Sequence, residues 1–328
     1  MFFTLFRRPG SVVFLDDDAD YLEMLAEVMS PEWPVRLFMS PVDCIRQLMQ
    51  EPIRWEADGW RQQEIVNRWQ GGTPLIPQIL HYWREDQAAR FAFTKVCVVD
   101  YAMPAMSGLQ VLGDLAGWTG YRVLLTGRIE EQLAVSAFNR GLIERFVPKQ
   151  AADIRLRLTG AIQELLDRPD ARHEQTWRST LSRDQYALLC DPAITSQLDE
   201  FVHSQAWIEH IVIGAPFGIL ALDAQGLASW LQLEPAQNLP ELAEMAESQG
   251  WSSAMVEEVR AGRKLIDLEL ELALGAGRMP ESQAAFCLAG ATDKLYAALF
   301  RIDASLSPAP NYSYASFIAS RDSRKIED

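Results

Sequence analysis

The first half of the chain alternates short apolar runs with segments in which apolar residues recur at helical spacing. The apolar runs occupy residues 11–15, 35–38, 96–99, 122–125 and 145–147. Strands that are apolar at nearly every position are typical of a parallel sheet covered by helices on both faces. We therefore predict that residues 1–167 form an α/β domain with a doubly wound parallel sheet.

One segment of this domain does not follow the alternation. Residues 51–93 carry two stretches with helical spacing around Gly71-Gly72-Thr73-Pro74, and we predict a helical hairpin inserted at one edge of the sheet. The insertion contains four tryptophans, Trp55, Trp60, Trp69 and Trp83. Their rings either pack onto the host domain or form an exposed aromatic surface for a partner or a second copy. We favour packing, because tryptophan side chains are usually mostly buried.

The second half of the chain shows a different order of elements. A polar stretch that contains Pro169 predicts a linker over residues 168–179, followed by a second domain over residues 180–328. The predicted elements are helices over 180–190 and 194–211, a hairpin of strands over 217–223 and 226–231, short helices, and strands over 268–274, 284–288, 295–302 and 312–318. The strand over 268–274 is predicted because leucine occupies every second position. This order indicates an α+β domain with a helix-flanked antiparallel sheet.

The composition narrows the functional classes. The net charge is −15 and the isoelectric point about 4.8, and no cluster of Lys and Arg stands out, so we expect no binding to nucleic acid. The four cysteines are widely spaced and no signal peptide is evident, which is typical of reduced thiols in a cytoplasmic protein. No run of about 18 apolar residues occurs, so we expect no membrane span.

Candidate chemistry lies where the predicted strands end. The run over 96–99 ends on Asp100, and the first run ends just before Asp16 and Asp17. In an open α/β sheet with these strands as neighbours, the carboxylates converge where the strand order reverses. Carboxylates this close repel one another unless a cation neutralises them, and Mg²⁺ is a suitable hard ion.

The ends of two further predicted strands add a hydroxyl and an ammonium group to the carboxylates. Thr126 follows the fourth apolar run and adds a hydroxyl, and Lys149 follows the fifth and adds a fixed positive charge. Acids, metal, hydroxyl and ammonium together form a site that can accept a phosphoryl group. Taken singly, each residue also fits a structural role, such as a helix-capping turn at Asp16 and Asp17. Their occurrence at successive strand ends in this order favours the site.

These residues resemble the receiver domain of two-component response regulators, over about residues 11–167 without the insertion. The matching motifs are Asp16-Asp17, Asp100 with Met103-Pro104 and Gly108, Thr126-Gly127, and Phe146-Val147-Pro148-Lys149. The resemblance implies a flavodoxin-like (βα)5 fold. It also implies that a histidine kinase or phosphotransfer protein phosphorylates Asp100 with Mg²⁺ as cofactor.

The resemblance further implies a role for each site residue. Asp17, Asp100 and the main-chain carbonyl of Ala102 would hold Mg²⁺, with Asp16 acting through water. Thr126 would bind a phosphoryl oxygen, Lys149 would pair with its charge, and Phe146 stands at the position of the aromatic switch residue. The chain departs from the family in three ways. Asp17 and Asp100 are 83 positions apart, about twice the usual spacing, which the insertion explains; Gln150 replaces the proline after Lys149; and Ala102 replaces a residue that often tunes phosphoryl lifetime.

The second domain resembles PAS-type sensor domains in its layout only. We expect a response regulator that signals through a non-DNA-binding output, by protein interaction or ligand sensing, with an unknown downstream protein. We expect a homodimer, and a phosphoryl-acceptor switch with self-dephosphorylation rather than a dedicated enzyme. One alternative is a degenerate receiver that acts as a constitutive interaction module. Another is an unrecognised enzyme, for which Asp267, Glu269 and Glu271 on one face of a predicted strand are candidate metal ligands; a solvated outer face explains them more simply.

Overall fold

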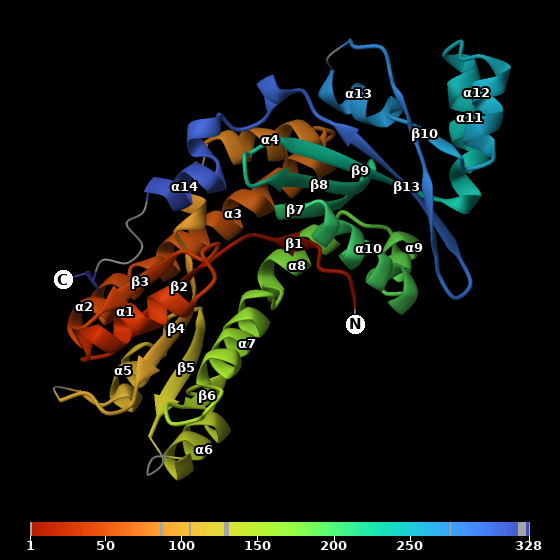
Figure 1. The fold of residues 1–328 in the computed structure, drawn as a ribbon. Coiled ribbons are helices and arrows are strands. Elements are labelled where there is room, and N and C mark those ends of the chain that lie inside the picture. The colour runs from red at the N-terminus through yellow and green to blue at the C-terminus, as the bar shows by residue number, and fades with distance from the viewer. Residues whose placement is uncertain are drawn as a thin grey trace. The chain divides into compact units, whose positions relative to one another are not determined.

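The computed structural model describes residues 2–85, 88–104, 106–127, 131–275, 277–320 and 326–327. The chain divides into two compact units, each made of segments distant in sequence (Figure 1). The parallel unit comprises Pro9–Asp58, Ala88–Arg168 and Ala315–Asp328, and the antiparallel unit comprises Met1–Arg8, Gly59–Gln87 and Pro169–Tyr314. Both units differ from the contiguous segments 1–167 and 180–328 that the sequence predicts.

The parallel unit contains the predicted doubly wound sheet. Its strands are β2 (Ser11–Leu15), β3 (Val35–Phe38), β4 (Thr94–Asp100), β5 (Tyr121–Thr126), β6 (Arg145–Pro148) and β14 (Ile326–Glu327), in the order β14-β3-β2-β4-β5-β6. Every neighbouring pair is parallel. The chain leaves β2 to form β3 on one side and returns to form β4 on the other. The strand order therefore reverses between β2 and β4.

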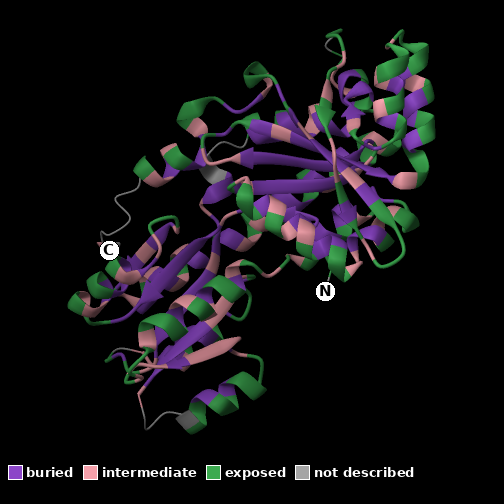
Figure 2. Cartoon of the chain, turned by 45° about the vertical axis from the view of Figure 1, so that its right-hand side comes forward, coloured by how far each residue is buried: buried purple, intermediate pink, exposed green. Residues whose placement is uncertain are grey.

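Helices cover both faces of this sheet because alternate strand residues point to opposite faces. On one face Val12, Phe14, Val96 and Val98 pack with residues of α1 (Ala19–Val28) and α7 (Ile154–Leu166). On the other face, Val13, Leu15, Cys97 and Val99 pack with residues of α2 (Pro41–Leu48), α5 (Gly108–Asp114) and α6 (Glu131–Asn139). The strands are buried while much of each helix faces solvent (Figure 2). The flavodoxin-like fold class is confirmed.

The predicted helical hairpin consists of α3 (Glu51–Gln70) and α4 (Leu75–Glu85). The boundary between the two units falls inside α3, after Asp58, so most of the insertion belongs to the antiparallel unit and not to the edge of its host sheet. The reason is the apolar face of α4, which shares one core with the antiparallel sheet; its buried residues include Ile76, Ile79, Leu80 and Trp83. Trp55 instead contacts Phe93, with ring centroids 4.6 Å apart, and Trp60 is 61% exposed.

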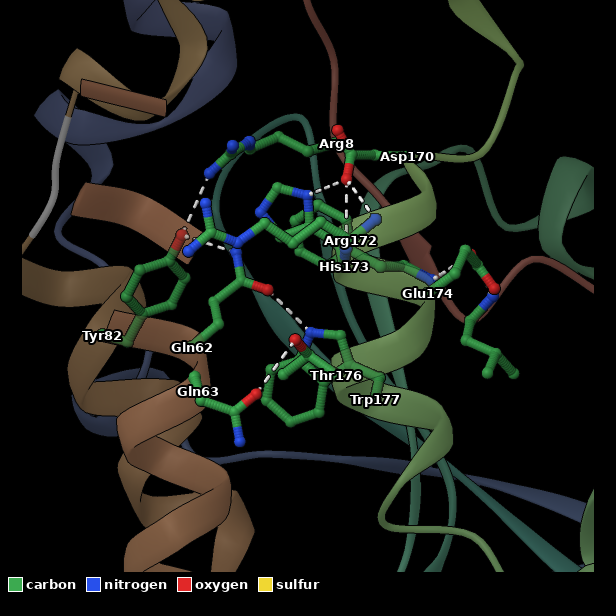
Figure 3. Close-up of polar contacts among 12 residues, drawn as sticks. Arg8, Gln62, Gln63, Tyr82, Asp170, Arg172, His173, Glu174, Thr176 and Trp177 are labelled. Carbon is green, nitrogen blue, oxygen red and sulfur yellow. Dashed lines mark hydrogen bonds and ion pairs between the residues drawn. The ribbon is translucent and has the colours of Figure 1, made fainter. Parts of the chain in front are cut away.

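Polar contacts hold the insertion to α8 (Ala171–Arg178), a helix that lies within the predicted linker (Figure 3). The Trp177 indole N–H donates to Gln62 at 2.7 Å, and the Thr176 hydroxyl donates to Gln63 at 3.4 Å. On the same helix, Glu174 accepts hydrogen bonds from the backbone N–H groups of Leu5 and Phe6. The N-terminal segment is thereby fixed within the antiparallel unit.

The antiparallel unit is built on a sheet in the order β1-β7-β8-β9-β13-β12. Its strands are β1 (Phe6–Arg7), β7 (Trp207–Gly214), β8 (Phe217–Asp223), β9 (Ala228–Pro235), β12 (Phe286–Ala289) and β13 (Lys294–Arg301). All neighbouring pairs are antiparallel, and the predicted hairpin is the β8–β9 pair. A separate small ladder joins β10 (Lys264–Ile266) and β11 (Ser282–Ala284). Among the described residues, the other α-helices are α9 (Arg183–Leu189), α10 (Pro192–Ser204), α11 (Leu239–Ser248), α12 (Ser253–Arg260), α13 (Leu268–Leu274) and α14 (Tyr314–Ser320).

Three predicted elements of this half are wrong. Residues 268–274 form α13 rather than a strand; leucine and glutamate are good helix formers, and Leu272 is 74% exposed, which a strand with one buried leucine face does not allow. The helix predicted over 194–211 ends at Ser204, and its last part belongs to β7. The strand predicted over 312–318 is helical, since α14 covers most of it. No helix in the described ranges is both long and apolar enough to cross a membrane.

The antiparallel unit contains a buried carboxyl group that makes stability depend on pH. The pKa of Glu234, on β9, is raised from an ordinary 4.5 to about 7, mainly by burial; a hydrogen bond with Asn238 opposes the rise and the charge of Glu269 adds to it. The folded protein thus holds this proton more tightly than the unfolded chain does. The stabilisation is complete below about pH 4.5 and is lost as the pH rises through about 7.

We expect the free energy of unfolding to fall over this range by at most about 3 kcal/mol on account of Glu234. The variant Glu234→Gln cannot lose a proton there, so its stability relative to wild type is expected to grow as the pH rises. Urea titrations of both proteins near pH 5 and near pH 8 measure this difference, in which the other titrating groups cancel. An equal difference at the two pH values would contradict the assignment.

Candidate functional site

Three carboxylates meet where the strand order of the parallel unit reverses. Asp16 and Asp17 follow β2, Asp100 is the last residue of β4, and these two strands are neighbours in register, with Leu15 opposite Val99. One carboxylate oxygen from each aspartate lies within 4.8 Å of the other two. Asp16 and Asp100 are buried and Asp17 is exposed. The group therefore combines two buried carboxylates with one that borders solvent.

Lys149 brings a positive charge to the two buried carboxylates. It follows β6, and its Nζ lies 2.7 Å from Asp16 Oδ2 and 2.8 Å from Asp100 Oδ1. Burial disfavours the ammonium, but the hydrogen bonds to Asp100 and Asp16 outweigh it and raise the pKa of Lys149. Burial also raises the pKa of Asp16, against the hydrogen bond from Lys149, which lowers it. In the site as it stands, one cation compensates two of the three anions.

Thr126 and Phe146 lie on the two strands that follow β4 in the sheet. Thr126 ends β5; its hydroxyl is buried and has no hydrogen-bond partner among the described residues. Phe146 lies on β6, half-buried, and packs against the core under α5 and α6. The free hydroxyl is the group that an incoming acceptor oxygen could satisfy.

The loop after Asp100 keeps the carboxylate in place. The backbone N–H of Ala102 donates to Asp100 Oδ2 at 3.1 Å, and Ala102 itself is exposed. Gly108 donates its N–H to the Tyr101 carbonyl, and a Cβ at this position would lie 2.2 Å from the carbonyl oxygen of Asp100. Only glycine allows this close approach, which is the physical reason for the glycine eight residues after the aspartate.

In the acidic triplet Asp16-Asp17-Asp18, one residue caps the following helix and the other two belong to the site. The Asp18 side chain caps α1 by accepting the backbone N–H of Tyr21 at 3.1 Å. Asp16 Oδ1 accepts the backbone N–H of Asp18, also at 3.1 Å. The cap therefore fixes the turn that carries Asp16 and Asp17 into the site.

The carboxylates proposed for the second domain do not form a comparable group. Because residues 268–274 are helical, Asp267, Glu269 and Glu271 do not share a strand face. Arg278 lies 3.3 Å from Asp267 and 3.0 Å from Glu271 and pairs with both carboxylates. Within the described part of the chain, the aspartates at the ends of β2 and β4 form the only group of three or more side chains with metal-ligand spacing.

Tyr21 is a site residue that the sequence pattern did not single out. The pattern places it only on the apolar face of a helix, whereas its ring centroid lies 4.5 Å from Lys149 Nζ. The available signal was its place in the first turn of the helix that directly follows the acidic triplet.

Comparisons with protein-family models and with curated proteins find no match. Among solved structures, the response regulator LqsR of Legionella pneumophila matches with a TM-score of 0.69 and 19% sequence identity, over 100% of both chains. A receiver domain protein of Methanospirillum hungatei matches 49% of this chain and 94% of its own at 15% identity, with a TM-score of 0.31. One of Clostridium thermocellum matches 48% and 94% at 16% identity, also with a TM-score of 0.31. Over its whole length, the chain shares the fold of the Legionella response regulator.

Proposed function

We propose that this protein is a response regulator of a two-component phosphorelay, and that Asp100 accepts the phosphoryl group. The observation that carries the proposal is the group of Asp16, Asp17 and Asp100 at the strand-order reversal, with Lys149 between two of them. Ligands and chemistry in open α/β sheets concentrate at this position. The donor is a histidine kinase or a phosphotransfer protein, by resemblance to receiver domains.

The donor set suits a magnesium ion. Three carboxylates with oxygens this close are the hard, oxygen-only ligands that Mg²⁺ prefers, and the exposed Asp17 leaves room for retained waters. Asp17, Asp100 and the carbonyl of Ala102 would hold the ion, with Asp16 acting through water. When bound, Mg²⁺ neutralises charge on the carboxylates and on the oxygens of the transferred group.

The residues of the chain then have distinct tasks. The Asp100 carboxylate attacks phosphorus; the P–N bond of the phosphohistidine breaks as the P–O bond of the acyl phosphate forms, and the imidazole leaves with the electron pair. The Ala102 N–H orients Asp100 from one side. Lys149 transfers its ion pair from the carboxylate to a phosphoryl oxygen. The Thr126 hydroxyl, which has no hydrogen-bond partner among the described residues, donates to another. Movement of Thr126 and Phe146 would carry the change to the surface near β5 and β6.

We assign the signalling output of the protein to its antiparallel unit. Its sheet and helices carry protein interaction or ligand sensing in our proposal, and the net charge of −15 disfavours a DNA-binding output. Self-association as a homodimer and a PAS-type identity of this unit remain predictions. The acyl phosphate is lost by self-dephosphorylation, so the protein is a switch rather than a dedicated enzyme.

The test is incubation of the full chain with acetyl phosphate and Mg²⁺, followed by intact-mass measurement. We expect an adduct of about 80 Da, the mass of one phosphoryl group, that EDTA suppresses because the carboxylates then repel the incoming anion. A chain that gains no mass with Mg²⁺ present would contradict the proposal and favour the constitutive interaction module.

A further inference from the structure

The Lys149 ammonium touches an aromatic ring as well as two carboxylates. Tyr21, in the first turn of α1, places its ring centroid 4.5 Å from Nζ, while Asp16 and Asp100 lie at 2.7 and 2.8 Å. A cation within about 6 Å of a ring centroid is attracted by the negative face of the ring. The ring thus forms part of the wall around the cation.

The contact is made by the ring and not by the phenol oxygen. The Tyr21 hydroxyl is buried and has no hydrogen-bond partner among the described residues. A buried hydroxyl without a partner costs free energy, so the hydroxyl does not account for the placement of this side chain. The ring face accounts for the placement, because it is the part of the Tyr21 side chain that contacts the Lys149 ammonium.

Lys149 needs such a wall because its side chain is a flexible four-carbon stem that also borders solvent. Its side chain is 25% exposed, whereas those of Asp16 and Asp100 are 2% and 6% exposed. Without the ring, the ammonium is free to sample solvent-facing rotamers in which it pairs with neither carboxylate. The attraction between a cation and a ring face depends less on direction than a hydrogen bond does. The ammonium can therefore shift toward a phosphoryl oxygen and keep its contact with the Tyr21 ring.

We propose that Tyr21 is a positioning residue for phosphoryl transfer, and that its ring acts by holding the Lys149 ammonium over Asp16 and Asp100. The inference rests on the proposed function of Asp100 as the acceptor. The competing explanation is that Tyr21 only fills space beside α1, in which case an aliphatic side chain of similar size serves equally well.

The first experiment compares the rate of acetyl phosphate labelling in Tyr21→Phe, Tyr21→Leu and wild type. The phenylalanine variant keeps the ring face and is expected to react within about twofold of wild type, while the leucine variant is expected to react about fivefold or more slowly. The matched control is Tyr121→Leu, which removes another cation–π pair of the parallel unit, that of Arg168 over the Tyr121 ring at 5.5 Å. It is expected to label at the wild-type rate. Equal rates for the Phe and Leu variants would overturn the inference.

The second experiment needs no phosphorylation. Each variant is treated briefly with acetic anhydride, and acetylation of every lysine is read by peptide mass mapping. We expect Lys149 to react about threefold or more faster in Tyr21→Leu than in wild type or Tyr21→Phe, with Lys264 and Lys294 unchanged as internal references. A Lys149 rate that is the same in all variants would show that Tyr21 does not act through this lysine. A wild type that never labels with acetyl phosphate would contradict the proposed function, while the acetylation rates would still decide the role of Tyr21.

Discussion

Replacing Asp100 by asparagine is expected to abolish the adduct of about 80 Da that acetyl phosphate and Mg²⁺ produce on the full chain. An amide oxygen is a poor nucleophile toward phosphorus and cannot form a stable acyl phosphate. The substitution also removes one of the three carboxylates within 4.8 Å of one another, which weakens the binding of a divalent cation. Both effects act in the same direction, so the loss is expected to be complete within the detection limit of intact-mass measurement.

The fold is expected to survive this change. In the Asp100→Asn variant the side-chain amide oxygen can still accept the N–H of Ala102, and the loss of charge relieves repulsion with Asp16. The matched control is Asp18→Asn, at an exposed aspartate whose capping role asparagine also performs well, and it should label like wild type. An adduct that persists in Asp100→Asn would place the acceptor on another residue, with Asp17 the first to examine.

Replacing Trp83 by alanine is expected to lower the free energy of unfolding by about 3–5 kcal/mol. The side chain is completely buried, in the core that α4 shares with the antiparallel sheet. Alanine forfeits the transfer free energy of the indole and leaves a cavity that the surrounding helices and strands fill only in part. Urea titration followed by circular dichroism measures the loss as a lower midpoint at an unchanged slope.

Trp60→Ala is the control for Trp83→Ala, since it lies in the same insertion and has the same chemistry. Its side chain is 61% exposed, so the substitution is expected to cost less than about 1 kcal/mol, most of it from the contact with the Arg172 guanidinium. Equal losses at the two positions would mean that α4 does not contribute a core face. They would also reopen the interpretation of the insertion as an exposed aromatic surface.

The parallel unit and its site could be predicted because their signals are local. Each strand is an apolar run that ends on the site residue, as β4 ends on Asp100, or directly before it, as β2 ends before Asp16. The alternation of strands and helices then brings the carboxyl ends to one edge of the sheet. Chain order, with the first and third strands taken as neighbours and with the resemblance to receiver domains, therefore predicted that Asp16, Asp17, Asp100 and Lys149 lie together.

The antiparallel unit was harder because its elements are decided by tertiary packing. Residues 268–274 alternate like a strand, yet the chain forms a helix there and buries Leu268 and Leu270 with Glu271. The β-branched run in β7 was an available signal for a strand, which the helical pattern before it masked. β1 is two residues long and exists only because β7 offers an edge, so nothing in its own sequence identifies it.

The interleaved composition of the units has a consequence for dissecting this protein. Along its length the chain passes between the units five times, so no single cut separates them. A fragment that ends at residue 167 would carry the apolar face of α4 without the sheet it packs on, and would lack the strand that lines β3. A fragment that begins at residue 180 would lack α4, α8 and the N-terminal strand. The two units of this protein therefore cannot be exchanged or isolated at one junction, and a variant of either unit has to be studied within the intact chain.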